Sequence, residues 1–351
     1  MPTGILQRLA LIVAMGTSGV AGAAVLKVPQ QYPTIQAAVD VAEDGDTVKV
    51  AAGTYAGNIR IVGKAVSLIG AGASQTTIDA GGAGRAISVL YADITIPAPN
   101  HVTIAGFTIR NGSVHDDDLE DFGAGWGAGL YAWASTIVVR DNVFTGNRGC
   151  PGIAIAAIGT DATLIRNRIQ ANLTNGPGCV SGNAVALVGG WVELQAVVLQ
   201  NVVRDHDASG MLIASLERVI LRGNIFRRNR PDAVPGVDTE FGALSVVATQ
   251  VTLQGNLFTE NSATGTGGAV IAANPIVATG NSFVANHTDW SASSLELAST
   301  TTNADVVKDN RFDESGDSPA IRCDGTIPID RSNVFASAPE TALVGGCERI
   351  N

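Results

Sequence analysis

The chain repeats a short motif in which an asparagine precedes an apolar residue by two positions. Six of its nine phenylalanines occupy that second position: Phe144, Phe226, Phe258, Phe283, Phe312 and Phe335. The motif asparagines are Asn142, Asn167, Asn201, Asn224, Asn256, Asn281, Asn310 and Asn333, and Ile169 and Val203 replace phenylalanine after the second and third. Their separations are 25, 34, 23, 32, 25, 29 and 23 residues. A minimum of 23 with variable additions predicts a fixed structural unit joined by loops of changing length.

Each unit also alternates apolar and other residues ahead of its asparagine, which indicates β-strands with one buried face. The positions three residues before the asparagine are Val139, Leu164, Val198, Leu221, Leu253, Ala278 and Val307. Two positions earlier stand Ile137, Ala162, Ala196, Val219, Val251 and Ile276, and Asp305 breaks the pattern. A second strand opens with glycine, and a third carries the motif itself. Three short strands per turn predict an all-β, single-stranded parallel β-helix, a solenoid.

Equivalent positions of a β-helix stack one rung apart, roughly 4.8 Å. The motif asparagines are therefore expected to form an amide ladder at one corner, because stacked amides satisfy each other's hydrogen bonds. The phenylalanines are expected to stack inside. A second ladder is predicted from the asparagines that follow three positions later, which are Asn147, Asn172, Asn229, Asn261 and Asn286. Both sets are structural residues and not site residues.

The two ends of the chain carry separate signals. Residues 1–23 are typical of a secretory signal peptide, with Arg8, an apolar run and a small-x-small cleavage site at Ala21-Gly22-Ala23. A buried N-terminal helix is the alternative. We expect one β-helix domain over 24–351, with caps at 24–46 and 313–351, because a solenoid core needs closing. Thr34 is the expected N-cap of a short capping α-helix that ends by Gly45.

Export implies an oxidising compartment, in which disulfides persist. Cys150 and Cys179 stand at equivalent places in successive turns, and a separation of one rung suits a disulfide. Cys323 and Cys347 are expected to pair across the C-terminal cap. A four-cysteine metal site is the alternative, but the spacing is not that of a zinc ribbon. No later stretch reaches the ~18 apolar residues of a spanning helix, so the predicted location is secreted, periplasmic or cell-surface, with no transmembrane segment.

Several segments near the N-terminus resemble the pectin-lyase-like right-handed parallel β-helix superfamily. They are Thr34-Ile35-Gln36-Ala37-Ala38-Val39, Gly45-Asp46-Thr47-Val48, Gly53-Thr54-Tyr55 and Leu68-Ile69-Gly70. The resemblance implies a right-handed coil and covers about residues 28 to 340. The superfamily includes polysaccharide lyases, hydrolases, esterases, epimerases and non-catalytic surface proteins. The catalytic signatures of its pectin methylesterases, polygalacturonases and uronate epimerases are missing here, so no specific enzyme family is matched.

Long insertions, at 112–126, 172–182, 204–210, 229–242 and 287–293, all fall at one corner of the turn. Loops grouped on one side of a solenoid usually form its binding face. The candidate catalytic residues there are His206, Arg228, Arg230, Asp205, Asp207 and Asp232. In a lyase, His206 or Arg228 is the expected base that removes a uronate proton, with Arg230 on the carboxylate. Asp205 or Asp207, paired with Asp232, could supply the two carboxylates of a glycoside hydrolase. The alternative for all of these residues is a solvated salt-bridge cluster that has no catalytic role.

A second cluster consists of carboxylates, which are Asp116, Asp117, Asp118, Glu120 and Asp121. Hard oxygen ligands suit Ca²⁺, so this is a candidate calcium site, with a solvated acidic loop as the alternative. Trp126, Trp133 and Trp290 lie near the same side and are candidates for stacking on sugar rings, or for packing. No other cofactor is indicated.

The net charge of −10, with only four lysines, excludes the basic surface of a nucleic-acid-binding protein. The sequence favours an exported β-helix protein whose partner is a polysaccharide or cell-surface glycan, bound along the long-loop face. An acidic polysaccharide is one option, and turnover, if any, would be that of a polysaccharide lyase before that of a glycoside hydrolase. The alternative is a non-catalytic cell-envelope or surface protein for binding or adhesion.

Overall fold

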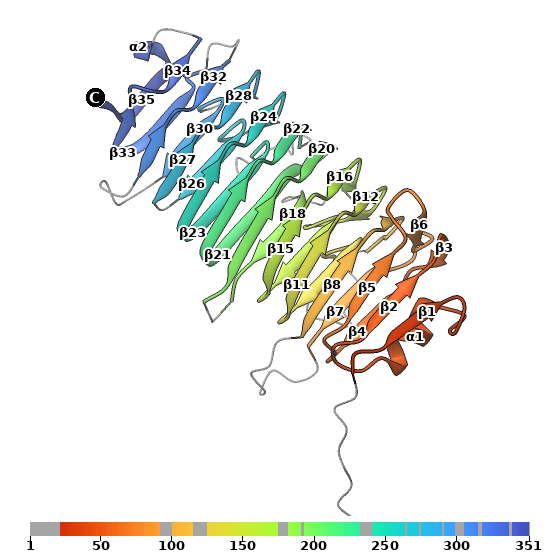
Figure 1. The fold of residues 1–351 in the computed structure, drawn as a ribbon. Helices are drawn as coiled ribbons and strands as arrows, with labels where there is room; N and C mark the ends of the chain where they lie inside the picture. Colours follow the sequence, from red (N-terminus) through yellow and green to blue (C-terminus); the bar gives the residue numbers. More distant parts are fainter. Residues whose placement is uncertain are drawn as a thin grey trace, which may run out of the picture.

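Short strands stack turn upon turn along one axis in this molecule (Figure 1). The computed structural model describes residues 22–91, 100–114, 125–174, 182–190, 193–231, 241–263, 265–273, 275–289, 291–298, 305–314, 318–336 and 339–350. The predicted signal peptide, residues 1–23, lies outside these ranges except for its last two positions.

The strands form three faces, built from a 20-stranded and an 11-stranded sheet. The first face consists of β4 (Ile59–Val62), β7 (Ile87–Leu90), β10 (Leu130–Trp133), β14 (Ile155–Ile158), β18 (Asn183–Val188), the first parts of β21 (Ser209–Arg222) and β23 (Leu244–Gln254), β26 (Val270–Ala273), β30 (Leu295–Ala298) and the first parts of β33 (Ile321–Asp330) and β35 (Leu343–Ile350). The second face consists of β1 (Val25–Val28), β2 (Thr47–Val50), β5 (Ser67–Gly70), β8 (His101–Ala105), β11 (Thr136–Arg140), β15 (Asp161–Ile165), β19 (Gln195–Leu199), β27 (Ile276–Thr279), β31 (Val306–Lys308) and the later parts of β21, β23, β33 and β35.

The third face is the 11-stranded sheet. Its strands are β3 (Gly53–Ala56), β6 (Thr76–Asp79), β9 (Thr108–Arg110), β12 (Val143–Thr145), β16 (Arg168–Gln170), β20 (Val202–His206), β22 (Ile225–Asn229), β24 (Leu257–Thr259), β28 (Ser282–Val284), β32 (Arg311–Asp313) and β34 (Val334–Phe335). Two short pairs follow it, β13 (Arg148–Gly149) with β17 (Leu173–Thr174), and β25 (Ser262–Ala263) with β29 (His287–Thr288).

Each turn visits the three faces in order, and successive turns pair in parallel. For example, β10, β11 and β12 pair with β14, β15 and β16 of the next turn. The structure is therefore a parallel β-helix, as the repeat predicts. The stack runs from α1 (Ile35–Val41) at one end to β35 at the other (Figure 1), and a second short helix, α2 (Pro339–Ala342), precedes β35.

The core is a set of columns in which equivalent residues of successive turns touch. Five phenylalanines of the third face stack, with ring centroids 4.9 to 5.1 Å apart: Phe226, Phe258, Phe283, Phe312 and Phe335. Phe144 is buried in the same column, between Ile109 and Ile169. The predicted phenylalanine stack is confirmed.

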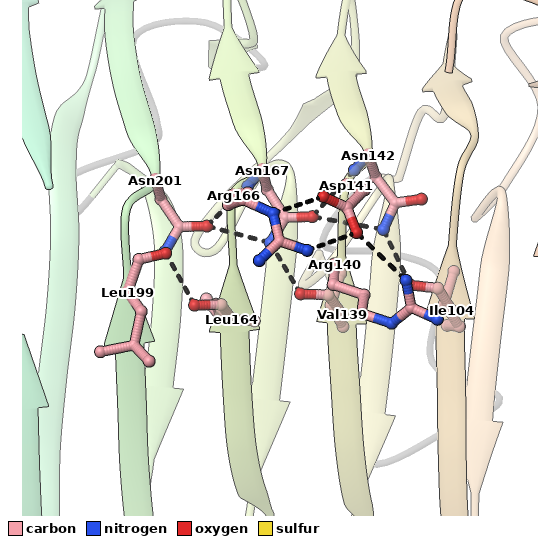
Figure 2. Close-up of polar contacts among 10 residues, drawn as sticks. All are labelled: Ile104, Val139, Arg140, Asp141, Asn142, Leu164, Arg166, Asn167, Leu199 and Asn201. Carbon is pink, nitrogen blue, oxygen red and sulfur yellow. Dashed lines mark hydrogen bonds and ion pairs between the residues drawn. The ribbon is translucent and has the colours of Figure 1, made fainter. Parts of the chain in front are cut away.

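The first asparagine ladder is also confirmed. The side-chain oxygen of Asn142 accepts from the backbone N–H of Phe107. Each later oxygen accepts from the backbone N–H and the Nδ2 of the asparagine one turn earlier, as Asn167 does from Asn142 (Figure 2). The Nδ2 of Asn167 also donates to the carbonyl of Val139, 2.7 Å away. The residue before each asparagine from Asn142 to Asn310 turns the corner in a left-handed conformation, with φ of 58° at Asp141 and 52° at Arg166. These two side chains form an ion pair that lowers the pKa of Asp141.

The N-terminal helix lies where the sequence places it. The Thr34 hydroxyl accepts from the backbone N–H of Ala37, and Ile35, Ala38 and Val39 are buried. The helix ends at Val41, with Ala42 as its C-cap, so it is shorter than the segment up to Gly45. No helix of the described ranges is long and apolar enough to cross a membrane.

The C-terminal cysteines are paired as predicted. The Cα atoms of Cys323 and Cys347 are 5.1 Å apart, and their disulfide joins β33 to β35. Cys150 is also disulfide-bonded, while its expected partner, Cys179, lies outside the described residues.

Candidate functional site

The predicted catalytic residues that the structure describes lie at or just after the ends of β20 and β22, where each turn leaves the third face. Asp205, Arg228 and Glu260 occupy equivalent positions on three successive turns, each left-handed, with φ of 59°, 51° and 56°. Arg204 and Arg227, which directly precede the first two, are register partners that point away from the core. We call these five residues the charged corner. Glu260 was not among the predicted residues, although it follows Phe258 at the spacing by which Arg228 follows Phe226.

The charges of this corner are paired with one another. Arg228 contacts Asp205 at 2.6 Å and Glu260 at 3.7 Å, while Arg204 and Arg227 contact Asp205 and Glu260 at 3.2 and 2.9 Å. All five side chains are partly exposed, by 31% to 42%. Exposed pairs of this kind contribute little stability each, but they form a continuous network. Because two carboxylates engage the Arg228 guanidinium, it is poorly placed to act as a base.

His206 is not on this surface. It is 3% exposed and stands in the second asparagine ladder, between Asn172 and Asn229. Its Nδ1 accepts from the backbone N–H of Asn172, and its Nε2 lies 3.1 Å from the carbonyl of Ile169, so the Nε2–H tautomer fits. Burial lowers the pKa of His206 to about 4. His206 was predicted as a candidate base, whereas its burial and its two ring contacts are those of a ladder residue.

The second ladder otherwise has the predicted members. Asn147 donates to Asn172, Asn229 to Asn261, and Asn261 to Asn286. Glu314 ends the ladder, because its two oxygens accept from the backbone N–H and the Nδ2 of Asn286, and burial raises the pKa of Glu314. The signal for His206 was in the sequence, since it follows Val203 by the three residues that separate each asparagine of this ladder from the apolar residue of its motif.

The other candidates are separated. Asp207 accepts from the backbone N–H of Thr174, 2.9 Å away, and Arg230 is exposed. Asp232, the acidic residues of 116–121 and Trp290 lie outside the described residues. Within the residues that the structure does describe, no group of three or more His, Cys, Asp or Glu could hold a metal ion.

A different surface was missed by sequence reasoning. The outward side of the first face carries an apolar column in register on nine successive strands, which we call the outer stripe. Its members are Val62, Leu90, Trp133, Ile158, Val188, Ala214, Val247, Ala273 and Ala298. At one rung of ~4.8 Å, the eight steps span about 38 Å.

Aromatic side chains gather at the N-terminal half of the outer stripe. Leu90, Tyr131 and Ala156 form a cluster separate from the core, and Trp126 and Trp133 pack partly buried against it. The guanidinium of Arg85 lies 4.5 Å from the centre of the Tyr131 ring. The sequence signal is that first-face strands are unbroken apolar runs, as in β10 and β14, which is typical of strands covered on both sides.

Comparisons with known proteins support the fold. No family model and no curated protein matches the chain. The solved structure of ORF18 from Geobacillus virus E2 is 14% identical, with a TM-score of 0.55, and covers 93% of this chain, which spans 60% of that one. The A-module of the Azotobacter vinelandii mannuronan C-5 epimerase AlgE6 is 16% identical over 90% of this chain and 94% of its own, with a TM-score of 0.43. PfbA, a surface adhesin of Streptococcus pneumoniae, is 13% identical over 90% and 88%, with a TM-score of 0.46. At these low identities, the similarity extends to the fold and not to function.

Proposed function

We propose that this is an exported β-helix protein that binds a polysaccharide along the outer stripe. The observation that carries the proposal is a continuous apolar column of about 38 Å, with Trp133 in it, on the outside of a sheet whose inside is the core. The apolar faces of sugar rings stack on aromatic side chains, and an extended polymer can follow a continuous column. Three long insertions, 112–126, 172–182 and 229–242, lead into strands of this face.

Export is part of the same proposal. The signal-like segment at 1–23 predicts it, and the Cys323–Cys347 disulfide supports an oxidising compartment. Right-handed coiling and the closing of the core by α1 are likewise inferred from the sequence resemblance. A calcium ion on the acidic residues 116–121 stays a candidate contribution to binding.

The alternative is a non-catalytic surface protein, and one observation favours binding over turnover. The charged corner pairs its own charges, and His206 is buried with both ring nitrogens engaged. A lyase needs a base that can reach the substrate. Lyase chemistry at Asp205, Asp207, Arg228, Arg230 and Asp232 is therefore the weaker proposal.

Two valines offer a matched test of the binding surface. Val247 on the outer stripe and Val277 on the second face are 39% and 38% exposed on neighbouring turns. Affinity electrophoresis against a polysaccharide panel should retard the wild-type protein. Val247→Asp should weaken binding at least tenfold, because a charge replaces apolar contact, and Val277→Asp should leave it unchanged. Failure of the wild type to bind any polymer, or equal losses in both variants, contradicts the proposal; ultraviolet absorbance from unsaturated uronide ends would reveal lyase turnover.

A further inference from the structure

Glu296 is the one carboxylate on the described strands of the first face from β4 to β30, when only the parts of β21 and β23 that pair within this face, Ser209–Ala214 and Leu244–Val247, are counted. Its neighbours in β30, Leu295 and Leu297, belong to the core, so Glu296 points outward. It lies two residues before Ala298, the last member of the outer stripe, and beside Ile271 of the preceding turn. Although it faces outward, it is only 8% exposed.

This buried carboxylate lacks a counter-charge. Its Oε2 accepts from the Ser291 hydroxyl at 2.6 Å, and among the described residues no cation pairs with it. Arg322 is its register partner on the next turn, but that guanidinium is directed to Asp324, 3.6 Å away. Among the described residues, Ser291 is therefore the one side-chain donor to this carboxylate, and the other oxygen of Glu296 is left to accept from a ligand.

The surroundings of Glu296 decide what kind of ligand can do so. Between β7 and β30, the first-face parts of the strands carry no basic residue. Two arginines lie nearby, and each is engaged: Arg85 with the Tyr131 ring and Arg322 with Asp324. A uronate placed beside Glu296 would meet a like charge at short range, on a protein of net charge −10. Sugar hydroxyls, in contrast, donate to a carboxylate in short charge-assisted hydrogen bonds and bring no charge.

We propose that Glu296 accepts hydrogen bonds from sugar hydroxyls at the end of the outer stripe, and that the ligand of this surface is a neutral polysaccharide. This inference rests on the proposed function and narrows it, because the sequence alone left an acidic polysaccharide open. Trp133 and its neighbours supply the apolar contact, and Glu296 orients the chain.

The test compares two neutral polymers, xyloglucan and mixed-linkage β-glucan, with two uronate polymers, polygalacturonate and alginate, by affinity electrophoresis. Wild-type protein should bind a neutral polymer at least tenfold more tightly than either uronate. Glu296→Gln keeps the shape of the side chain and removes its charge. This variant should bind the neutral polymer at least tenfold more weakly than the wild type does, and its preference for neutral over uronate polymers should be smaller. Glu296→Ala should show the same loss, and Glu217→Gln, a carboxylate of β21 away from the outer stripe, should bind as the wild type does.

The outcomes distinguish a failure of the neutral ligand at Glu296 from a failure of the outer stripe as the binding surface. Preference for a uronate, with binding still sensitive to Val247→Asp, overturns the neutral ligand and leaves the outer stripe as the binding surface. If both Glu296 variants bind the neutral polymer as tightly as the wild type does, the proposed role of Glu296 is wrong, and the outer stripe remains the binding surface. Absence of binding to all four polymers, with none found in the wider panel, overturns the binding surface itself.

Discussion

His206 is a single exception in a column of asparagines, and its chemistry differs from theirs. An asparagine offers both an acceptor and donors to its neighbours, whereas the neutral imidazole offers one of each. Its Nδ1 takes the N–H of Asn172 and its Nε2–H reaches the carbonyl of Ile169. As a result nothing reaches the buried Oδ1 of Asn229, which has no hydrogen-bond partner among the described residues. The ladder is interrupted at this point.

Replacement of His206 by asparagine should both stabilise the protein and flatten its pH dependence. The pKa of His206 is lowered to about 4 in the folded chain, below the ordinary 6.5, so the unfolded chain takes up the proton first as the pH falls. Stability is then full above pH 6.5 and declines by up to about 3 kcal/mol by pH 4. Urea unfolding across this range should show the decline in the wild type and less of it in His206→Asn. The exposed His101 provides the control, and a decline of the same size in His206→Asn would contradict the argument.

At the scale of the element, the sequence predicts the columns better than the surfaces. The asparagine and phenylalanine columns follow from spacing alone, because each position of the repeat has one place in the turn. The outer stripe was missed because alternation detects a strand with one buried face, while β10 and β14 are apolar on both. The pairing of Arg228 with Glu260 was also missed, because it joins residues 32 positions apart whose contact depends on the loop between them.

The stability lost when a phenylalanine of the stack is removed should depend on how many rings it contacts. Phe258 is fully buried between two rings, whereas Phe335 is partly buried and has one, Phe312. Loss of a buried aromatic ring costs about 3–5 kcal/mol when the cavity cannot collapse. Phe258→Ala should therefore reduce the free energy of unfolding by about that amount, and Phe335→Ala by clearly less. Chemical denaturation of both variants measures the difference, and equal losses would show that the stack does not set the cost.

For the whole molecule, a solenoid is held by contacts between neighbouring turns, so its stability varies along the axis. At the N-terminal end, α1 has one buried side and contacts β1, β2 and β4. At the other end, β35 pairs with β33 and is tied to it by the Cys323–Cys347 disulfide. The first strands are thus contacted by a packed helix, and β33 and β35 are joined by a covalent link.

Removal of that link should loosen one end and leave the middle unchanged. The two cysteines are 24 residues apart, and closing such a loop in the unfolded chain is worth about 3.5 kcal/mol in the chain-entropy account. In Cys323→Ser/Cys347→Ser, hydrogen exchange measured by mass spectrometry should accelerate in β33 and β35. Amides of β11, β15 and β19 should exchange as in the wild type, because each turn contacts only its neighbours. Acceleration of similar size in all strands would mean instead that the turns unfold together, and that the disulfide stabilises the whole stack.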